Sequence, residues 1–208
     1  MYPSIASLER LPQYLRILKK KREENVTHIS STVVAKELNL NSIQVRKDLA
    51  LISKTDGKPG IGFEVNELIN DIEEFLDLNN CKDVVIVGAG RLGQALMNHT
   101  EFENDINIVM AFDKDENKCN NTNIFNINQF ESMIKQKKIH IGIITVPKHE
   151  AQNVCDMMVK CGIKAIWNFA PTNLKAPADV VIKNEDLSAS LLILLKMLNK
   201  KDAKKSKH

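Results

Sequence analysis

The sequence is poor in several features that mark whole classes of protein. Its 208 residues include four cysteines and one tryptophan, and aromatic side chains make up only 5%. The cysteines form no C-x-x-C pair and have no companion histidines at metal-ligand spacing, which argues against a zinc site or a disulfide framework. No apolar run approaches the roughly 18–20 residues that span a bilayer, and charges interrupt the N-terminal segment where a signal peptide would be apolar. We therefore expect a cytoplasmic protein with reduced cysteines, no metal and no membrane segment.

The charges are unevenly distributed although the net charge is only +3. Residues 1–62 contain 11 Lys/Arg and 6 Asp/Glu, whereas residues 63–80 contain 6 acids and no base. Residues 81–195 are close to neutral, and residues 201–208 form a basic tail that we interpret as a frayed end. A basic N-terminal segment ahead of a neutral one favours a polyanion as its partner.

The N-terminal segment, residues 1–80, is predicted to form a helix-turn-helix. Helices are expected at 7–24, 31–38 and 42–52, and a three-residue turn at 39–41 joins the last two. Asn41 and Gln44 have the spacing of a capping box at the start of the third helix. Gln44, Arg46 and Lys47 lie on the side of this helix away from its apolar positions. Arg and Lys suit guanine edges or phosphates and Gln suits adenine, so we interpret 42–52 as a DNA recognition helix.

A wing and a connecting helix are expected after the recognition helix. Glycines and a proline between 54 and 65 predict a small hairpin, with Lys58 and Gly60 at its tip, where both are expected to contact DNA. Residues 65–79 then form an acidic amphipathic pattern that predicts a helix connecting two domains, with the boundary near 79–80.

A glycine-rich turn opens the second domain, residues 81–185. Val84–Val87 is an apolar, β-branched run of the kind found in buried parallel strands, and Gly88, Gly90 and Gly93 follow it as G-x-G-x-x-G. Such glycines allow the tight turn, the approach of a pyrophosphate and close helix packing. Asp113 ends the next predicted strand 20 residues after Gly93, where an acid binds ribose hydroxyls and favours NAD(H) over NADP(H).

The rest of this domain alternates predicted strands and helices, which indicates an α/β fold with a doubly wound, Rossmann-type parallel sheet. Ligands bind such sheets at the carboxyl ends of the strands. The residues at those ends are Gly88, Ala89, Gly90, Arg91, Leu92, Gly93, Asp113, Lys114, Thr145, Val146, Pro147, Asn168, Phe169, Ala170 and Pro171.

The last predicted helix, residues 186–200, is apolar nearly all round. One subunit does not bury so much apolar surface with a terminal helix, so a second copy of the chain is expected to cover it. The alternative is a helix packed wholly inside one subunit.

Several blocks in order resemble the Rex family of redox-sensing transcriptional repressors. They are RLPQYLR at 10–16, ISS at 29–31, QVRKDL at 44–49, VGAGRLG at 87–93, FDKD at 112–115, TVP at 145–147 and AIWNFAP at 165–171. The resemblance spans about residues 3–199 and implies a winged-helix domain, a Rossmann domain and a domain-swapped C-terminal helix. It further implies a homodimer that binds a palindromic operator in double-stranded DNA. NADH releases the DNA, whereas NAD⁺ binds the same pocket and permits DNA binding.

The same resemblance suggests where the redox state is sensed. The groups expected near the nicotinamide are residues 168–171, Asp186 and Arg16, and the last two could pair in one state and separate in the other. Ser31 is expected to contact DNA. His99 stands where family members commonly carry a tyrosine, so a different contrast between NADH and NAD⁺ is expected.

The residues argue against two other classes of function. An NAD-dependent oxidoreductase with an N-terminal extension would need a substrate domain and a proton donor, and Lys148, His140 and His149 suggest no such arrangement. A nucleotide-binding module that acts on a protein partner would not need the basic helix-turn-helix. We therefore expect a regulator and not an enzyme.

Overall fold

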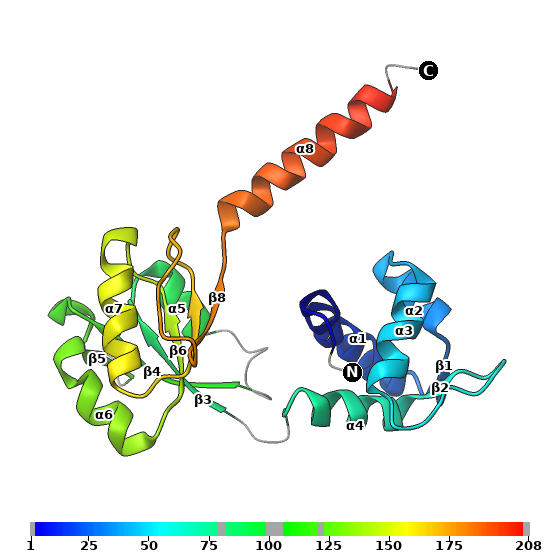
Figure 1. Ribbon diagram of the computed structural model, residues 1–208, viewed down its shortest axis with the longest axis horizontal. Coiled ribbons are helices and arrows are strands. Elements are labelled where there is room, and N and C mark those ends of the chain that lie inside the picture. Colours follow the sequence, from blue (N-terminus) through cyan, green and yellow to red (C-terminus); the bar gives the residue numbers. More distant parts are fainter. Residues whose placement is uncertain (1–2, 79–81, 99–105, 120–122, 206–208) are drawn as a thin grey trace. The chain divides into compact units, whose positions relative to one another are not determined.

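The computed structural model describes residues 3–78, 82–98, 106–119 and 123–205 (Figure 1). The chain divides into two compact units, Met1–Asn80 and Cys81–His208.

Within residues 3–78, the described part of the first unit, there are four helices and a two-stranded antiparallel sheet. These are α1 (Ile5–Glu23), β1 (His28–Ile29), α2 (Ser31–Leu38), α3 (Ser42–Ile52), β2 (Phe63–Glu64) and α4 (Val65–Phe75). Two expected helices, α2 and α3, have the predicted bounds. Ser30 caps α2 by accepting a hydrogen bond from the Val33 N–H, and Asn41 caps α3 in the same way.

The ends of α1 and α4 differ from the prediction for local reasons. Ser4 accepts a hydrogen bond from the Ser7 N–H at 3.2 Å, so α1 begins two residues earlier than expected. Pro12 consequently lies in the interior of α1 and not in its first turns. The prediction that the connecting helix reaches 79 is wrong, because α4 ends at Phe75 and Asp77 has a left-handed φ of 56°.

One apolar core holds the first unit together. Leu11, Leu15 and Leu18 of α1 pack with Val45 and Leu49 of α3. The α4 side chains in the same cluster are Val65, Leu68, Ile69 and Ile72. Because α3 packs into this core through one face, its opposite face, with Gln44, Arg46 and Lys47, is exposed.

The second unit is built on a six-stranded parallel sheet. Its strands are β3 (Lys82–Val87), β4 (Ile106–Asp113), β5 (Ile124–Asn126), β6 (Ile141–Ile144), β7 (Ala165–Asn168) and β8 (Val181–Asn184). Their order across the sheet is β5-β4-β3-β6-β7-β8, and all neighbouring pairs are parallel. The chain therefore reverses its direction of winding between β3 and β6, which confirms the doubly wound prediction and places the ligand crevice there.

The helices that cover the sheet are shared unequally between its faces. On one face, α6 (Phe130–Lys137) and α7 (Lys148–Lys160) pack against Val85 and Val87 of β3 (Figure 1). On the other face, α5 (Arg91–Met97) contributes Leu96 to a smaller cluster with Val84 and Ile86. In that cluster Ile106, Ile108, Trp167 and Phe169 are only partly buried, so the α5 face is incompletely covered by the described part of its own unit.

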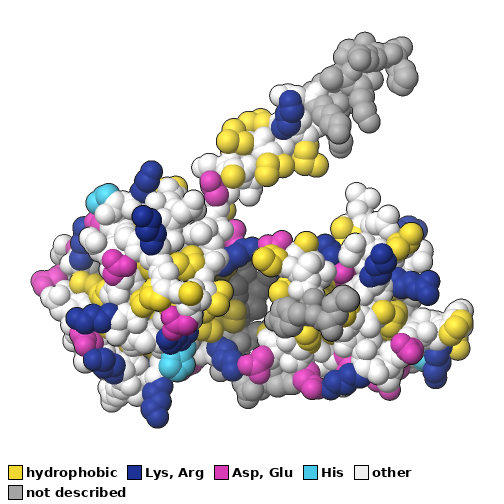
Figure 2. All heavy atoms as spheres, viewed as in Figure 1, with side chains coloured by type: hydrophobic (Ala, Val, Ile, Leu, Met, Phe, Trp, Pro, Cys, Tyr) yellow, Lys and Arg dark blue, Asp and Glu magenta, His cyan; other side chains and the backbone are white. Residues whose placement is uncertain are grey.

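The final helix, α8 (Leu187–Lys205), presents apolar side chains to solvent. Leu191, Leu192, Ile193, Leu194 and Leu195 are 49–65% exposed, and Figure 2 shows hydrophobic side chains along the helix. The alternative of a helix packed inside one subunit is therefore wrong. The helix also continues through Lys205, into the segment expected to be a frayed tail. No helix in the described ranges is long and apolar enough to cross a membrane.

Candidate nucleotide-binding and DNA-binding sites

Glycine stands at the three positions after β3 for different structural reasons. Gly88 has a φ of 108°, and a Cβ there would lie 2.8 Å from the Thr145 backbone. A Cβ on Gly93 would lie 2.0 Å from the carbonyl oxygen of Gly88. Apart from Gly90 itself and its two chain neighbours, no residue has an atom within 4 Å of the position that a Cβ on Gly90 would take. Packing inside the protein thus explains Gly88 and Gly93, whereas Gly90 borders open space.

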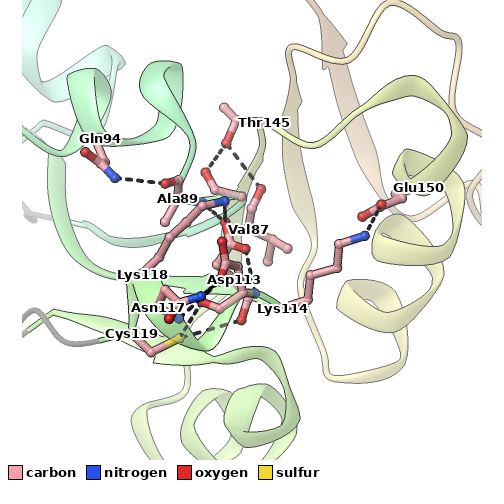
Figure 3. A network of polar contacts seen from close by, with 12 residues as sticks. Val87, Ala89, Gln94, Asp113, Lys114, Asn117, Lys118, Cys119, Thr145 and Glu150 are labelled. Atoms are coloured by element: carbon pink, nitrogen blue, oxygen red, sulfur yellow. Dashed lines mark hydrogen bonds and ion pairs between the residues drawn. The ribbon is translucent and has the colours of Figure 1, made fainter.

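Neighbouring side chains hold the turn in place (Figure 3). Thr145 Oγ1 donates to the Gly88 carbonyl at 2.7 Å, and Gln94 Nε2 donates to the Ala89 carbonyl at 2.9 Å. The Ala89 N–H donates to Asp113 Oδ2 at 2.8 Å. The turn is therefore fixed by the ends of β4 and β6 and by α5 before any ligand arrives.

Asp113 is buried but strongly hydrogen-bonded. Besides Ala89, Lys118 Nζ lies 3.0 Å from Oδ2, and the Asp115 N–H donates to Oδ1 at 2.9 Å. Burial alone would raise the pKa of Asp113, but the bonds from Asp115, Lys118 and Ala89 lower it below its ordinary value. The carboxylate is charged at neutral pH. Three of its roughly four acceptor positions are occupied, which leaves less capacity for two ribose hydroxyls than expected.

A cavity of about 570 Å³ lies beside this turn. It brings together predicted residues that are far apart in the sequence, namely Gly88, Gly90, Asp113, Lys114, Thr145, Val146 and Pro147. Its volume is in the range of small-molecule sites. An open glycine, a fixed carboxylate and a cavity at the switch point fit the pyrophosphate and ribose of a dinucleotide.

Other side chains of this cavity were not anticipated. They are Val87, Lys118, Ile127, Glu150 and Val154. Lys114 forms an ion pair with Glu150 of α7, and His149 Nε2 lies 3.3 Å from the same carboxylate. The sequence does contain a signal for Lys118, which is a base five residues after the acid that ends β4.

Several predicted cofactor residues do not line this cavity. They are Ala89, Arg91, Leu92, Gly93, Asn168, Phe169, Ala170 and Pro171. Asn168 is fully buried, and its amide bonds with Ala170, Thr172 and Asn184. Its side chain therefore shapes the segment after β7, where Phe169 packs against Trp167 with ring centroids 4.5 Å apart.

The remaining predicted switch residues are placed as follows. Asp186 Oδ1 accepts a hydrogen bond from the Ala189 N–H at 2.9 Å at the start of α8. Arg16 is exposed on α1, in the first unit. His99 lies outside the described residues.

A second cavity of about 560 Å³ lies between α2, α3 and the wing. Ser31, Arg46, Lys58 and Gly60, four of the six predicted DNA contacts, line it together. The wing is a tight hairpin in which the Lys58 N–H donates to the Gly62 carbonyl at 2.9 Å and the reverse bond measures 2.8 Å. The structure thus confirms the predicted wing and places it beside α3.

The exposed face of α3 carries Gln44, Arg46 and Lys47. The predicted capping box is half correct. Asn41 accepts from the N–H groups of Ile43 and Gln44, but the Gln44 side chain bonds with Asp48 and does not return to Asn41.

The described residues contain no cluster of three potential metal ligands. Cys119, Cys155 and Cys161 are free thiols, and burial raises the pKa of each. The remaining cysteine, Cys81, lies outside the described ranges.

Fold and sites together define a winged-helix protein with a Rossmann-type nucleotide-binding unit. A family model described as a CoA binding domain matches residues 79–172, and one described as a putative DNA-binding protein N-terminus matches residues 4–50. The redox-sensing transcriptional repressor Rex of Treponema denticola is 41% identical over 204 residues, which cover 96% of this chain and 97% of the relative. That of Clostridium novyi is 39% identical over 94% of this chain and 95% of the relative.

Solved structures of a Rex-family repressor are similar to this chain over nearly its full length. RSP, a Rex-family repressor crystallised with β-NAD⁺ and operator DNA, is 36% identical with a TM-score of 0.87, covering 99% of this chain and 97% of RSP. RSP with β-NADH is 35% identical with a TM-score of 0.85 and full coverage of both chains. The chain belongs to the Rex family of redox-sensing transcriptional repressors.

Proposed function

We propose that this protein is a transcriptional repressor that binds a palindromic operator and senses the ratio of NADH to NAD⁺. The observation that carries the proposal is the pairing, in one chain, of a winged helix with a cavity that borders the open side of Gly90. RSP, which is similar over the whole chain, binds β-NADH, β-NAD⁺ and operator DNA. Because the relatives are named as repressors, we do not propose the oxidoreductase alternative.

The chemistry of the cavity supports a position for each part of the cofactor. The pyrophosphate lies against the backbone at Gly90, Arg91 and Leu92, and the adenosine ribose lies near Asp113. Lys114 and Lys118 also line this cavity. The nicotinamide half is proposed to extend past Thr145–Pro147 toward 168–171, with His99 nearby.

A homodimer with a swapped C-terminal helix would bury two apolar surfaces that one copy leaves exposed. One is the apolar, exposed α8, and the other is the sheet face on which α5 leaves Ile108, Trp167 and Phe169 partly buried. We propose that α8 of each copy covers the α5 face of the other. The dimer presents two recognition helices, as a palindromic site in double-stranded DNA requires, and it acts in the cytoplasm.

Sensing requires the two cofactors to prefer different dimer arrangements. NADH and NAD⁺ differ at the nicotinamide ring, and a ligand shifts an equilibrium only by its differential affinity for the two states. We propose that NADH favours a dimer whose α3 helices do not match successive major grooves. Arg16 and Asp186 are the proposed pair that forms in one state and separates in the other.

The DNA-binding half of the proposal is tested with duplexes carrying a randomised palindrome. The protein should select one sequence, and Arg46→Ala or Lys47→Ala should weaken binding to it by about 1–3 kcal/mol without changing NADH affinity. Lys160→Ala, which removes an exposed base from α7, is the matched control and should bind like the wild type. No selected sequence, or steady oxidation of NADH with a small metabolite, would refute the proposal.

A further inference from the structure

Asp48 is a buried carboxylate on the recognition helix, with a side chain only 3% exposed. Its Oδ2 accepts hydrogen bonds from Arg10 Nε at 2.7 Å and Tyr14 Oη at 2.8 Å, both from α1. Its Oδ1 accepts from Gln44 Nε2 at 2.9 Å, one turn earlier on α3. The two oxygens thus face different partners.

The partners keep Asp48 ionised. Burial by itself would raise the pKa of Asp48, but the hydrogen bonds from Arg10, Tyr14 and Gln44 lower it below its usual value. At neutral pH the group is a carboxylate, which can only accept hydrogen bonds.

This restricts the amide of Gln44. Because Oδ1 of Asp48 accepts only, the NH₂ end of the amide must face it, and Oε1 is directed away. One N–H of Gln44 is used, so an acceptor and a second donor remain for a ligand. Gln44 is exposed on the face of α3 that also carries Arg46 and Lys47.

We propose that Asp48 is a positioning residue that makes Gln44 select adenine over guanine in the operator. In the major groove adenine presents a donor, N6–H₂, beside an acceptor, N7, whereas guanine presents two acceptors, O6 and N7. A glutamine amide that offers an acceptor and a donor matches adenine only. This inference deepens the proposed function and depends on α3 entering the major groove.

Replacing Asp48 by asparagine should invert the preference. Arg10 can only donate, so the carbonyl oxygen of Asn must take the side of Arg10 and Tyr14. The new NH₂ group then faces Gln44, whose amide turns to accept with Oε1. Gln44 would present two N–H donors outward, which match O6 and N7 of guanine.

The experiment uses full-length protein and the duplex that the wild type selects from the randomised palindromes. Each A·T pair of a half-site is replaced in turn by G·C, and affinities are measured at one salt concentration. At one position the wild type should favour adenine by about tenfold, and Asp48→Asn should favour guanine or lose the discrimination. Wild-type discrimination retained at every position by a folded Asp48→Asn protein would overturn the inference.

Asp71→Asn is the matched control. Asp71 is also buried in the first unit and accepts a hydrogen bond from the Lys54 N–H at 2.9 Å, but it lies on α4. Its replacement should lower stability and leave the ratio of adenine to guanine affinities unchanged. A change in that ratio for Asp71→Asn equal to the change for Asp48→Asn would also overturn the inference, because it would show a general effect of instability.

If Asp48→Asn does not fold, Gln44→Ala tests whether Gln44 reads adenine. It leaves the bonds of Asp48 with Arg10 and Tyr14 in place, and it should abolish the adenine preference at the same position. Unchanged discrimination would refute the role of Gln44. Neither result affects the proposed function, which fails only if the wild type selects no duplex or does not respond to NADH.

Discussion

At the scale of single residues, the glycine turn shows that residues of the same type can be required for unrelated reasons. Gly93 is needed because a Cβ would overlap the Gly88 carbonyl, whereas Gly90 leaves open space on the side of the cavity. Gly90 has a φ of −76°, which any residue adopts. The fold and the ligand therefore place separate demands on the two positions.

Alanine substitutions separate those demands. Gly93→Ala should lower the free energy of unfolding by at least about 2 kcal/mol, because the new Cβ meets backbone. Gly90→Ala should change it by less than about 1 kcal/mol and should weaken NADH binding at least about tenfold, because the methyl group occupies the approach of the pyrophosphate. Thermal unfolding and NADH titration check both. Full NADH affinity in Gly90→Ala would contradict the assigned position of the pyrophosphate.

Tyr14 gives a pH-dependent test of the network that joins α1 to α3. Burial, together with its hydrogen bond to Asp48, raises the pKa of Tyr14 to about 12 from 10. A raised folded-state pKa contributes stability that is present below the unfolded pKa and lost as pH rises. The stability difference between the wild type and Tyr14→Phe should therefore shrink from about pH 10 to about pH 12. A difference that is constant over this range would show that Tyr14 ionises as in the unfolded chain.

Sequence spacing predicted the position of Asp113 but not its bonding. The motif locates an acid at the end of the second strand. Its bonds with Asp115 and Lys118 are local, but the bond from Ala89 depends on how the turn after β3 folds against the end of β4. Asp48 was overlooked for a related reason. An acid on a basic helix carries no sign that Arg10 and Tyr14, more than 30 residues earlier, will bury it.

At the scale of elements, prediction succeeded where local chemistry determines the boundary. The helix-turn-helix was predictable because Ser30 and Asn41 cap α2 and α3 within their own sequence. The strand β3 was predictable because Val84–Val87 is a short apolar, β-branched run that is buried in the parallel sheet. The end of α4 was not, since its apolar pattern continues through Leu76 and Leu78 after the helix has stopped.

The terminal helix α8 gives an element-scale prediction. Leu191 and Leu194 share a face and are 58% and 60% exposed. Replacing both by glutamate removes four apolar side chains from the proposed dimer interface. The free energy of dimerisation should become less favourable by about 6 kcal/mol or more. Sedimentation equilibrium should then report the monomer mass of 23.5 kDa, and binding to a palindromic duplex should fall. Lys196→Glu, which changes an exposed charge on the same helix, is the control, and an intact dimer for the double variant would refute the role assigned to α8.

At the scale of the whole molecule, one chain carries two separate units with different ligands. The winged helix has its own core and the Rossmann-type sheet has its own two, so each unit can fold around its own apolar residues. Binding of the cofactor can therefore affect DNA binding only by changing how the two units and the two copies are arranged. Sequence patterns do not predict this change, because the same residues adopt two alternative arrangements.

The central claim is tested most directly by following a labelled palindromic duplex by fluorescence anisotropy while the ratio of NADH to NAD⁺ is varied at constant total cofactor. The duplex should stay bound with NAD⁺ alone and should be released progressively as the fraction of NADH rises. Equal DNA affinity at every ratio, for a protein shown to bind both cofactors, would contradict it.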